Sequence, residues 1–301
     1  MSKPSEIIET AAELDERDKA ILVALAQHKL LTTEHIHTLF FSSLRRTQTK
    51  IQELREKGFI TTLSSARARG KRPDRHHLTG LGARVAAFCL DRTPSELPAP
   101  ATEAGLWRAL PHRMGVNDFF CRLVAACDRH PGTGVHAWKD ERQIRGGGKQ
   151  VQADAFGRIL HPEGAVEFLL EYDRGTEHFW PVVEKLGRYL KVSSAHSPDE
   201  PVPFPSVLFL VGGEAREAML SRALGVAVER WDLRGARSAA MPFFVSNRRL
   251  LRAEGHLGAV WQPLTEPDRR LRLTELDGPA ECWWELSECL RIRWLEGAAE
   301  Q

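Results

Sequence analysis

Three acidic side chains have the types and spacing needed for metal chemistry. Residues 166–177 read Val-Glu-Phe-Leu-Leu-Glu-Tyr-Asp-Arg-Gly-Thr-Glu, and Asp154 precedes this segment. The short apolar run predicts a buried strand. Because side chains two residues apart on a strand share a face, Glu171 and Asp173 should point the same way. Such a carboxylate pair is costly without a counter-charge, since burial and like charges both oppose ionisation.

A divalent cation would supply that counter-charge. Asp154 lies on the preceding predicted strand and could join Glu171 and Asp173. A few hard carboxylate oxygens plus water are the ligands that Mg²⁺ prefers. We therefore expect Asp154, Glu171 and Asp173 to hold Mg²⁺ or Mn²⁺, with Glu141 as an accessory acid from the strand before. Metal-assisted phosphodiester chemistry is a natural use of such a site.

The same acids also allow a purely structural interpretation. Glu171 and Asp173 could pair with Arg174, Lys185 or Arg188 in a buried ion network. Such a network perturbs pKa values as a catalytic site does. The residue types alone leave both interpretations open.

An α/β pattern would position these acids. Strands are expected at 135–141, 150–159, 165–173 and 206–211, and three more at 242–246, 259–264 and 271–276. Helices are expected at 106–127, 176–192 and 214–224. This order of helix, strands, helix, strand and helix is typical of a layered α/β domain with a mixed sheet.

The first ninety residues predict a different arrangement. Helices are expected at 15–28, 32–40 and 43–57, with Thr32 and Ser43 as N-caps of the second and third. Leu44, Ile51 and Leu54 should pack inward from the third helix. Strands at 59–63 and 76–78 would then form a hairpin, followed by a helix at 81–90.

This order of three helices and a basic-tipped hairpin resembles a winged helix-turn-helix domain. The resemblance implies that the third helix reads base edges in the major groove while the hairpin tip contacts phosphates or the minor groove. The expected DNA-binding residues lie on that helix and around the tip: Arg45, Arg46, Thr49, Lys50, Arg67, Arg69, Lys71, Arg72 and Arg75. A solvated helix face, or a protein contact made by the same fold, is the competing interpretation.

Length and composition indicate a two-domain protein. The chain has 301 residues, of which 27% are charged, and a net charge of +2. We expect a winged helix at 1–90, a Pro- and Ala-rich linker at 91–105 and a second domain at 106–301. No apolar run approaches the ~20 residues of a membrane span, and the N-terminus lacks a signal-peptide core, so a cytoplasmic location is expected. The five cysteines lack Cys-x-x-Cys spacing, which argues against structural zinc.

The second domain resembles the core of the PD-(D/E)XK nuclease superfamily, which holds Mg²⁺ on acids placed like Asp154 and Glu171. Here the proline before Asp154 is missing, and Asp173 occupies the position of the usual lysine. The resemblance implies that Asp154, Glu171 and Asp173 are catalytic, with Lys185 of the next helix taking the role of the lysine. Tyr189 shares a helix face with Lys185 and resembles an accessory element of some members.

The chain as a whole resembles one family more closely. His112-Arg-Met-Gly-Val-Asn-Asp-Phe, Ala153-Asp-Ala, Leu170-Glu-Tyr-Asp-Arg-Gly-Thr-Glu and Lys185-Leu-x-x-Tyr are similar to segments of the replication-relaxation family, over roughly residues 15–212. This family occurs on plasmids and other mobile elements of bacteria. The resemblance implies a role in plasmid replication, DNA relaxation or conjugative mobilisation.

Two functions from different classes follow. The first is a metal-dependent DNA endonuclease or nicking factor, to which the winged helix delivers DNA. The second is a non-catalytic DNA-binding regulator or scaffold, whose second domain mediates dimerisation or partner contacts; the replaced lysine motivates it. The expected partners are double-stranded DNA, replication or mobilisation proteins, and a second copy of the chain.

Overall fold

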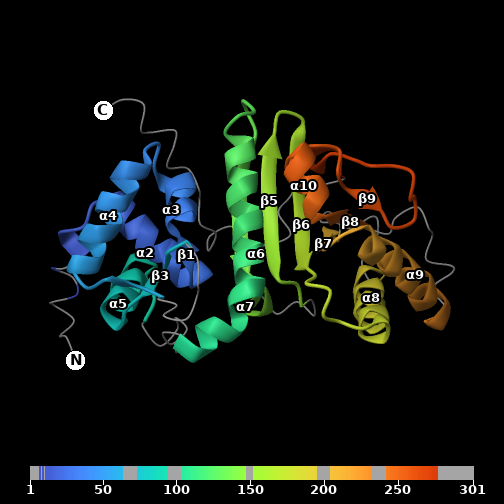
Figure 1. The fold of residues 1–301 in the computed structure, drawn as a ribbon, viewed down its shortest axis with the longest axis horizontal. Helices are drawn as coiled ribbons and strands as arrows, with labels where there is room; N and C mark the ends of the chain where they lie inside the picture. The colour runs from blue at the N-terminus through green and yellow to red at the C-terminus, as the bar shows by residue number, and fades with distance from the viewer. Residues whose placement is uncertain are drawn as a thin grey trace. The chain divides into compact units, whose positions relative to one another are not determined.

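The computed structural model describes residues 11–63, 73–93, 103–146, 152–194, 204–231 and 242–276, together with residues 7 and 9 (Figure 1). The chain forms two compact units, one reaching Cys121 and the other beginning at Arg122. The division falls within helix α6 (Glu103–Cys127). The domain boundaries expected from the sequence stay a prediction.

The first unit combines helices with a small antiparallel sheet. Its elements are α2 (Glu16–His28), β1 (Leu31–Thr32), α3 (Thr33–Phe40), α4 (Leu44–Glu56), β2 (Ile60–Thr62), β3 (Arg75–Leu78) and α5 (Gly80–Cys89). The three strands have the order β1-β3-β2. The predicted helices and hairpin strands are therefore confirmed, while the two-residue strand β1 was not anticipated.

Helix starts in this unit are set by local capping. Thr32 accepts a hydrogen bond from the backbone N–H of His35 at 3.0 Å, as its N-cap role predicts. Ser43 occupies the N-cap position of α4 but makes no side-chain capping bond. The Ser43 carbonyl accepts from both the backbone N–H of Thr47, at 3.0 Å, and the Thr47 hydroxyl, at 2.9 Å.

The packing of α4 corrects one expectation. Ile51 and Leu54 are buried as predicted, but Leu44 is 47% exposed, so its inward packing was wrong. As the first residue of the helix, Leu44 lies before the turns that face the core. Lys50 lies on the side toward α2, where its ammonium is 3.1 Å from Asp18 and 3.4 Å from Asp15. Lys50 therefore holds two helices together.

The second unit is built around a six-stranded sheet. Its strands are β4 (Gly134–Asp140), β5 (Ala155–His161), β6 (Gly164–Tyr172), β7 (Ser206–Val211), β8 (Phe243–Asn247) and β9 (Gln262–Pro263), in this order across the sheet. Its helices are α7 (Glu141–Gly146), α8 (Phe179–Ser194), α9 (Glu214–Arg230), α10 (Arg248–Glu254) and a 3₁₀ turn at Leu273–Glu275. The expected combination of helices with a mixed sheet is confirmed.

Several expected strands differ from the structure. The strand expected at 150–159 begins only at Ala155, so Asp154 precedes it, and the strand expected at 259–264 is reduced to Gln262–Pro263. The strand predicted at 271–276 was wrong, because this segment forms a single bridge at Leu271 and then the 3₁₀ turn. The strand predicted to reach Glu141 ends at Asp140. Asp140 Oδ1 accepts from the backbone N–H groups of Arg142 and Gln143, both at 3.0 Å, and this cap starts α7 at Glu141.

The strand directions explain where the two long helices lie. β4, β5 and β6 are antiparallel neighbours, whereas β6, β7 and β8 are parallel. Parallel strands require crossover connections, and right-handed crossovers that advance in one direction place their helices on one face of the sheet. α8 and α9 are these two crossovers, and they lie side by side (Figure 1).

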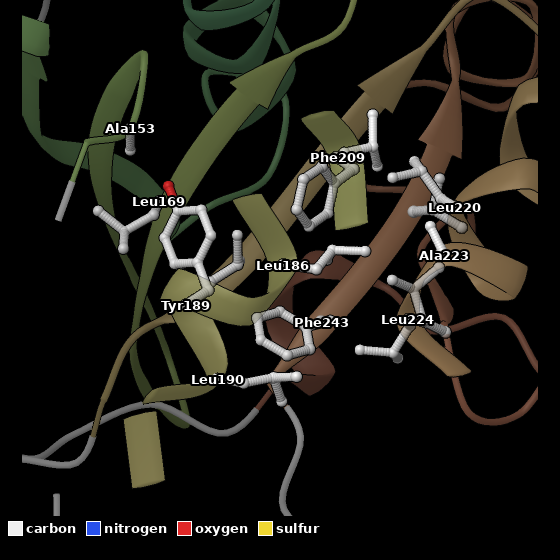
Figure 2. Close-up of a cluster of buried hydrophobic side chains, with 14 of the residues drawn as sticks. Ala153, Leu169, Leu186, Tyr189, Leu190, Phe209, Leu220, Ala223, Leu224 and Phe243 are labelled. Atoms are coloured by element: carbon white, nitrogen blue, oxygen red, sulfur yellow. The ribbon is translucent and has the colours of Figure 1, made fainter. Parts of the chain in front are cut away.

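A continuous apolar core joins α8 and α9 to this face (Figure 2). Its helical members include Val183, Leu186 and Leu220, and Phe209 and Phe243 are among its members from the sheet. Fully burying one such side chain stabilises the fold by roughly 1.5–3 kcal/mol.

Within the part of the chain that the structure describes, no helix combines the length and the hydropathy that a membrane-spanning segment needs.

A substitution at Gly187 should test the α8–α9 packing. A Cβ at Gly187 would overlap the ring of Trp231, whereas a Cβ at Gly225, in α9, would meet nothing within 4 Å. We expect Gly187→Ala to lower the free energy of unfolding by about 1–3 kcal/mol through overpacking. Gly225→Ala should be neutral or stabilise by up to ~1 kcal/mol, since alanine favours helix. Urea unfolding of both variants checks this; equal stabilities would contradict the packing described.

Candidate functional site

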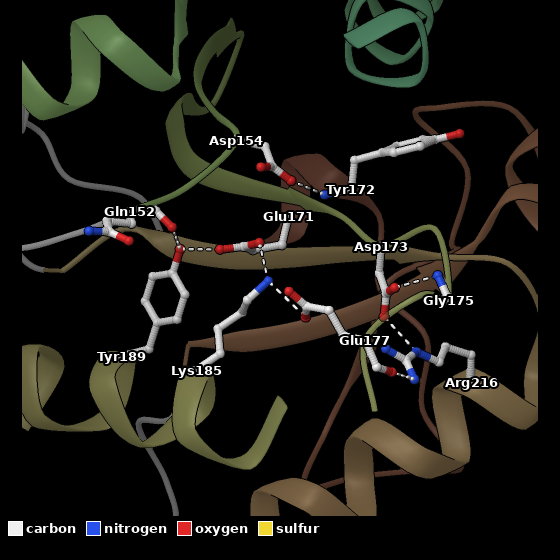
Figure 3. Close-up of polar contacts among 10 residues, drawn as sticks. All are labelled: Gln152, Asp154, Glu171, Tyr172, Asp173, Gly175, Glu177, Lys185, Tyr189 and Arg216. Carbon is white, nitrogen blue, oxygen red and sulfur yellow. Dashed lines mark hydrogen bonds and ion pairs between the residues drawn. The ribbon is translucent and has the colours of Figure 1, made fainter. Parts of the chain in front are cut away.

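A buried carboxylate occupies the end of the central strand β6. Glu171 pairs with Phe209 of β7 and is only 3% exposed. Its Oε1 accepts a hydrogen bond from the Tyr189 hydroxyl at 2.7 Å, and its Oε2 accepts from Lys185 Nζ at 3.1 Å (Figure 3). Lys185 and Tyr189 lie one turn apart on α8, so their shared face meets one carboxylate, as their spacing predicts.

Lys185 connects two acids. Besides Glu171, its ammonium lies 3.2 Å from Glu177, in the segment that joins β6 to α8. Burial by itself lowers the pKa of Lys185, but the charges of Glu171 and Glu177 raise it above its ordinary value. Lys185 therefore carries its positive charge across the neutral pH range and serves as the counter-charge of this cluster.

Asp154 approaches Glu171 from the neighbouring strand. It precedes β5, its backbone N–H donates to the Leu170 carbonyl at 3.0 Å, and its Oδ2 accepts from the Tyr172 N–H at 2.8 Å. Asp154 is partly exposed, whereas Glu171 is buried. Burial, followed by the negative charge of Asp154, raises the pKa of Glu171 to about 7 despite the opposing effects of Lys185 and Tyr189.

Asp173 lies on the same face of the sheet as Glu171, the face covered by α8 and α9, but it has a different partner. Its Oδ2 accepts from Arg216 Nε of α9 at 2.6 Å, and its Oδ1 accepts from the Gly175 N–H at 2.6 Å. Arg216 also donates to the Glu177 carbonyl at 2.8 Å. Figure 3 shows Asp173 turned toward Arg216, while Glu171 is turned toward α8. Glu171 and Asp173 thus have separate counter-charges.

The Tyr189 hydroxyl has two acceptors and one hydrogen. It lies 2.7 Å from Glu171 Oε1 and 3.3 Å from the Gln152 carbonyl. When Glu171 is ionised, the hydroxyl donates to the nearer carboxylate. When Glu171 is protonated, its own O–H can donate to Tyr189, whose hydrogen then turns to Gln152. Protonation of Glu171 therefore reverses the direction of this hydrogen-bond chain.

The donor types fit a hard cation, but the predicted trio is not gathered. Among the described residues, no group of three or more His, Cys, Asp or Glu side chains is arranged to hold a metal ion. Asp154 and Glu171 remain as two carboxylates whose mutual repulsion raises a pKa. A divalent ion would relieve that repulsion. Asp173 is bound to Arg216, and Glu141, predicted on the first strand, instead opens α7.

The predicted DNA-contacting residues have different surroundings. Arg45, Arg46 and Thr49 are exposed at the start of α4, and Arg75 is half-buried on β3. Lys50 is occupied by Asp15, Asp18 and Glu53. Arg67, Arg69, Lys71 and Arg72 lie outside the described residues. Of the residues predicted to contact DNA, Arg45, Arg46 and Thr49 are therefore the ones that the structure exposes on α4.

Sequence reasoning missed Arg216. The sequence does contain a sign of its pairing: Arg216 lies in the first turn of a helix, where the macrodipole disfavours cations. A cation in that position indicates that a nearby acid compensates. Here the acid is Asp173, 43 positions earlier in the chain, and their pairing depends on β6 and β7 being parallel neighbours.

The raised pKa of Glu171 predicts a pH-dependent stability in metal-free protein. Between pH 4.5 and about 7, the unfolded chain releases the Glu171 proton while the folded chain keeps it. The folded state then binds more protons, so stability falls as pH rises through this window and levels off above it. The change is on the order of 3 kcal/mol.

Unfolding curves recorded with EDTA at pH 5 and pH 8 check this expectation. Glu171→Gln cannot ionise and should lose the decline, whereas Glu163→Gln, exposed in the β5–β6 turn, should retain it. Parallel pH profiles of the wild type and Glu171→Gln would contradict the assignment.

Comparison with known proteins adds a family to this geometry. Residues 22–203, more than half of the chain, match the family described as replication-relaxation. The match includes α4, the acids Asp154, Glu171 and Asp173, and both α8 residues that contact Glu171. No curated protein and no solved structure matches the chain. The chain belongs to the replication-relaxation family.

Proposed function

We propose that the first unit is a winged helix that binds double-stranded DNA. The observation that carries this proposal is the exposure of Arg45 and Arg46 at the start of α4, whose first turn contains no acid. In a helix-turn-helix domain this end of the third helix meets the base edges of the major groove. The family indicates a role in the replication or relaxation of mobile elements, which is consistent with a DNA partner.

The arrangement after α4 supports the same proposal. β2 and β3 are antiparallel, with Thr61 opposite His77, and together with α2, α3 and α4 they follow the order of a winged helix. Its hairpin connection is rich in arginine and lysine. Basic side chains there would contact phosphates, which give affinity and orientation rather than sequence specificity.

Duplex binding should depend on the start of α4. Replacing Arg45 and Arg46 together by alanine should weaken binding of a duplex and reduce the slope of log K against log salt by about 0.9 for each phosphate that is no longer neutralised. Arg55→Ala is the matched control, because Arg55 is exposed at the other end of the same helix. Fluorescence anisotropy across a salt series measures both. Equal slopes for the double variant and the wild type would contradict this DNA surface.

We further propose that the second unit is a PD-(D/E)XK-like domain whose centre nicks or cleaves DNA. The antiparallel β4-β5-β6, followed by α8 and the parallel strand β7, supports this. Asp154 directly precedes β5, Glu171 lies on the adjacent strand β6, and Lys185 supplies an ammonium beside Glu171 from α8. In the superfamily pattern, a lysine stands where this chain has Asp173. Lys185 is placed to take the role of that lysine.

Asp154 and Glu171 are the residues that would hold Mg²⁺ or Mn²⁺. Such an ion supplies positive charge to a phosphodiester and lowers the pKa of bound water. The protein residues have distinct tasks around it. Tyr189 and Lys185 fix the rotamer of Glu171 through their two hydrogen bonds. Lys185, partly exposed, can also orient a phosphate oxygen or the attacking water.

A non-catalytic scaffold is the second candidate function, and the ion pairs favour it. Lys185 already neutralises Glu171, and Arg216 already neutralises Asp173. A domain with these internal counter-charges is stable without a metal, so it could serve dimerisation or bind a replication or mobilisation protein. The two functions differ in whether Asp154 matters for DNA chemistry.

A nicking assay distinguishes them. With Mn²⁺ or Mg²⁺, the wild type should convert supercoiled plasmid to the nicked form, and Asp154→Asn should reduce the rate at least about 100-fold if it removes a metal ligand. Glu163→Gln should cut like the wild type. Intact plasmid with every protein, together with duplex binding unchanged by Asp154→Asn, would establish the scaffold instead.

A further inference from the structure

An exposed tryptophan stands on the outer side of the α8–α9 pair. Trp180, in the first turn of α8, is 58% exposed, which is unusual for so large an apolar side chain. Its ring meets the edge of Phe179 with centroids 5.5 Å apart. Phe179 therefore supports the Trp180 ring from one side and leaves much of its surface in solvent.

One arginine lies near both this ring and a second tryptophan, and a lysine lies near the second. The Arg230 guanidinium lies 6.0 Å from the centroid of Trp180 and 5.3 Å from that of Trp231. Lys191 Nζ lies 5.3 Å from the centroid of Trp231. Arg188 is also exposed on α8, between Trp180 and Lys191 in the sequence. Trp180, Arg188, Lys191, Arg230 and Trp231 form what we call the aromatic-basic strip.

We propose that the aromatic-basic strip binds single-stranded DNA, an inference that rests on the proposed DNA-related function and names a second DNA form for it. Exposed aromatic rings beside basic side chains are the general requirement for binding single strands, because every unpaired base can stack on a ring while the cations follow the phosphates. A base would stack on Trp180, and Arg188, Lys191 and Arg230 would contact the backbone.

The length of the strip suits a short stretch of nucleotides. Trp180 and Lys191 are separated by eleven residues of one helix, which is about 16 Å at ~1.5 Å per residue. A stacked strand advances ~3.4 Å per nucleotide, so a few nucleotides would cover this distance. The strip lies on α8, whose inner face carries Lys185 and Tyr189, so a strand bound there would be held by the same helix that contacts Glu171.

Charge favours a nucleic acid over an apolar protein partner. Arg188 and Lys191 are exposed cations, which would attract the phosphates of a nucleic acid. A single strand suits Trp180 better than a duplex does, because stacked base pairs bury the base faces on which Trp180 would stack. Glu184 opposes this preference, because its carboxylate lies 3.2 Å from Arg230. Removing the Glu184 charge should therefore strengthen binding of a single strand, whereas it would have little effect on an uncharged partner.

Anisotropy with a labelled oligothymidine of about twenty nucleotides tests the strip in the full chain. Trp180→Ala should weaken binding at least about fivefold, Trp180→Tyr should largely restore it, and Glu184→Gln should tighten it. Phe88→Ala is the matched control, since Phe88 is 49% exposed on α5 of the first unit. It should leave oligothymidine binding unchanged.

Three outcomes would overturn the inference. These are wild-type protein that does not bind the oligothymidine, Trp180→Ala that binds as tightly as the wild type, and Trp180→Ala that weakens duplex and single strand equally. Loss of duplex binding in the Arg45 and Arg46 variant, with oligothymidine binding retained, supports two separate surfaces. If the Arg45 and Arg46 substitutions leave duplex binding and its salt dependence unchanged while the strip variants change oligothymidine binding as expected, that result would contradict the winged-helix proposal and support the aromatic-basic strip.

Discussion

Glu171 has to be accommodated inside the protein, because it lies on a central strand with neighbours on both sides. A carboxylate there is costly unless it receives hydrogen bonds and a counter-charge. Lys185 and Tyr189 provide these, and they reach Glu171 only when α8 crosses the end of β6. The parallel pairing of β6 with β7 imposes that path, since parallel strands need a crossover. The acid and the topology thus stabilise each other.

The distribution of counter-charges determines what each acid can do. Lys185 serves Glu171 and Glu177, while Arg216 binds Asp173, so the connection from β6 to α8 is tied to both helices. Asp154 is the member whose charge destabilises ionised Glu171. A cation between those two would relieve a repulsion that the protein itself leaves in place. Asp173 is already paired with Arg216, so the three acids divide into two carboxylates that repel each other and one that forms an ion pair.

Local chemistry made much of the fold predictable. The cap formed by Thr32 and the apolar run 207–211 of β7 are signals contained within a few residues, and both elements lie where the sequence indicated. Predictions failed where a strand end or the burial of a side chain depended on a capping bond that the prediction left out or on packing between distant elements. Asp140 ends its strand by capping α7, and Leu44 is exposed because the core of the first unit lies beyond its turn. A hydrophobic residue type alone could not reveal that position.

The sequence by itself determined which residues could cooperate: the i, i+2 acids share a face of the sheet, and Lys185 and Tyr189 share a face of one helix, because backbone periodicity is fixed locally. It also carried the family, through segments that span most of the chain. Only the tertiary structure decided the pairings. Arg216 reaches Asp173 from another crossover, and Lys50 is engaged by α2. Such pairings depend on how distant elements pack, and electrostatic energy follows distance in space rather than along the chain.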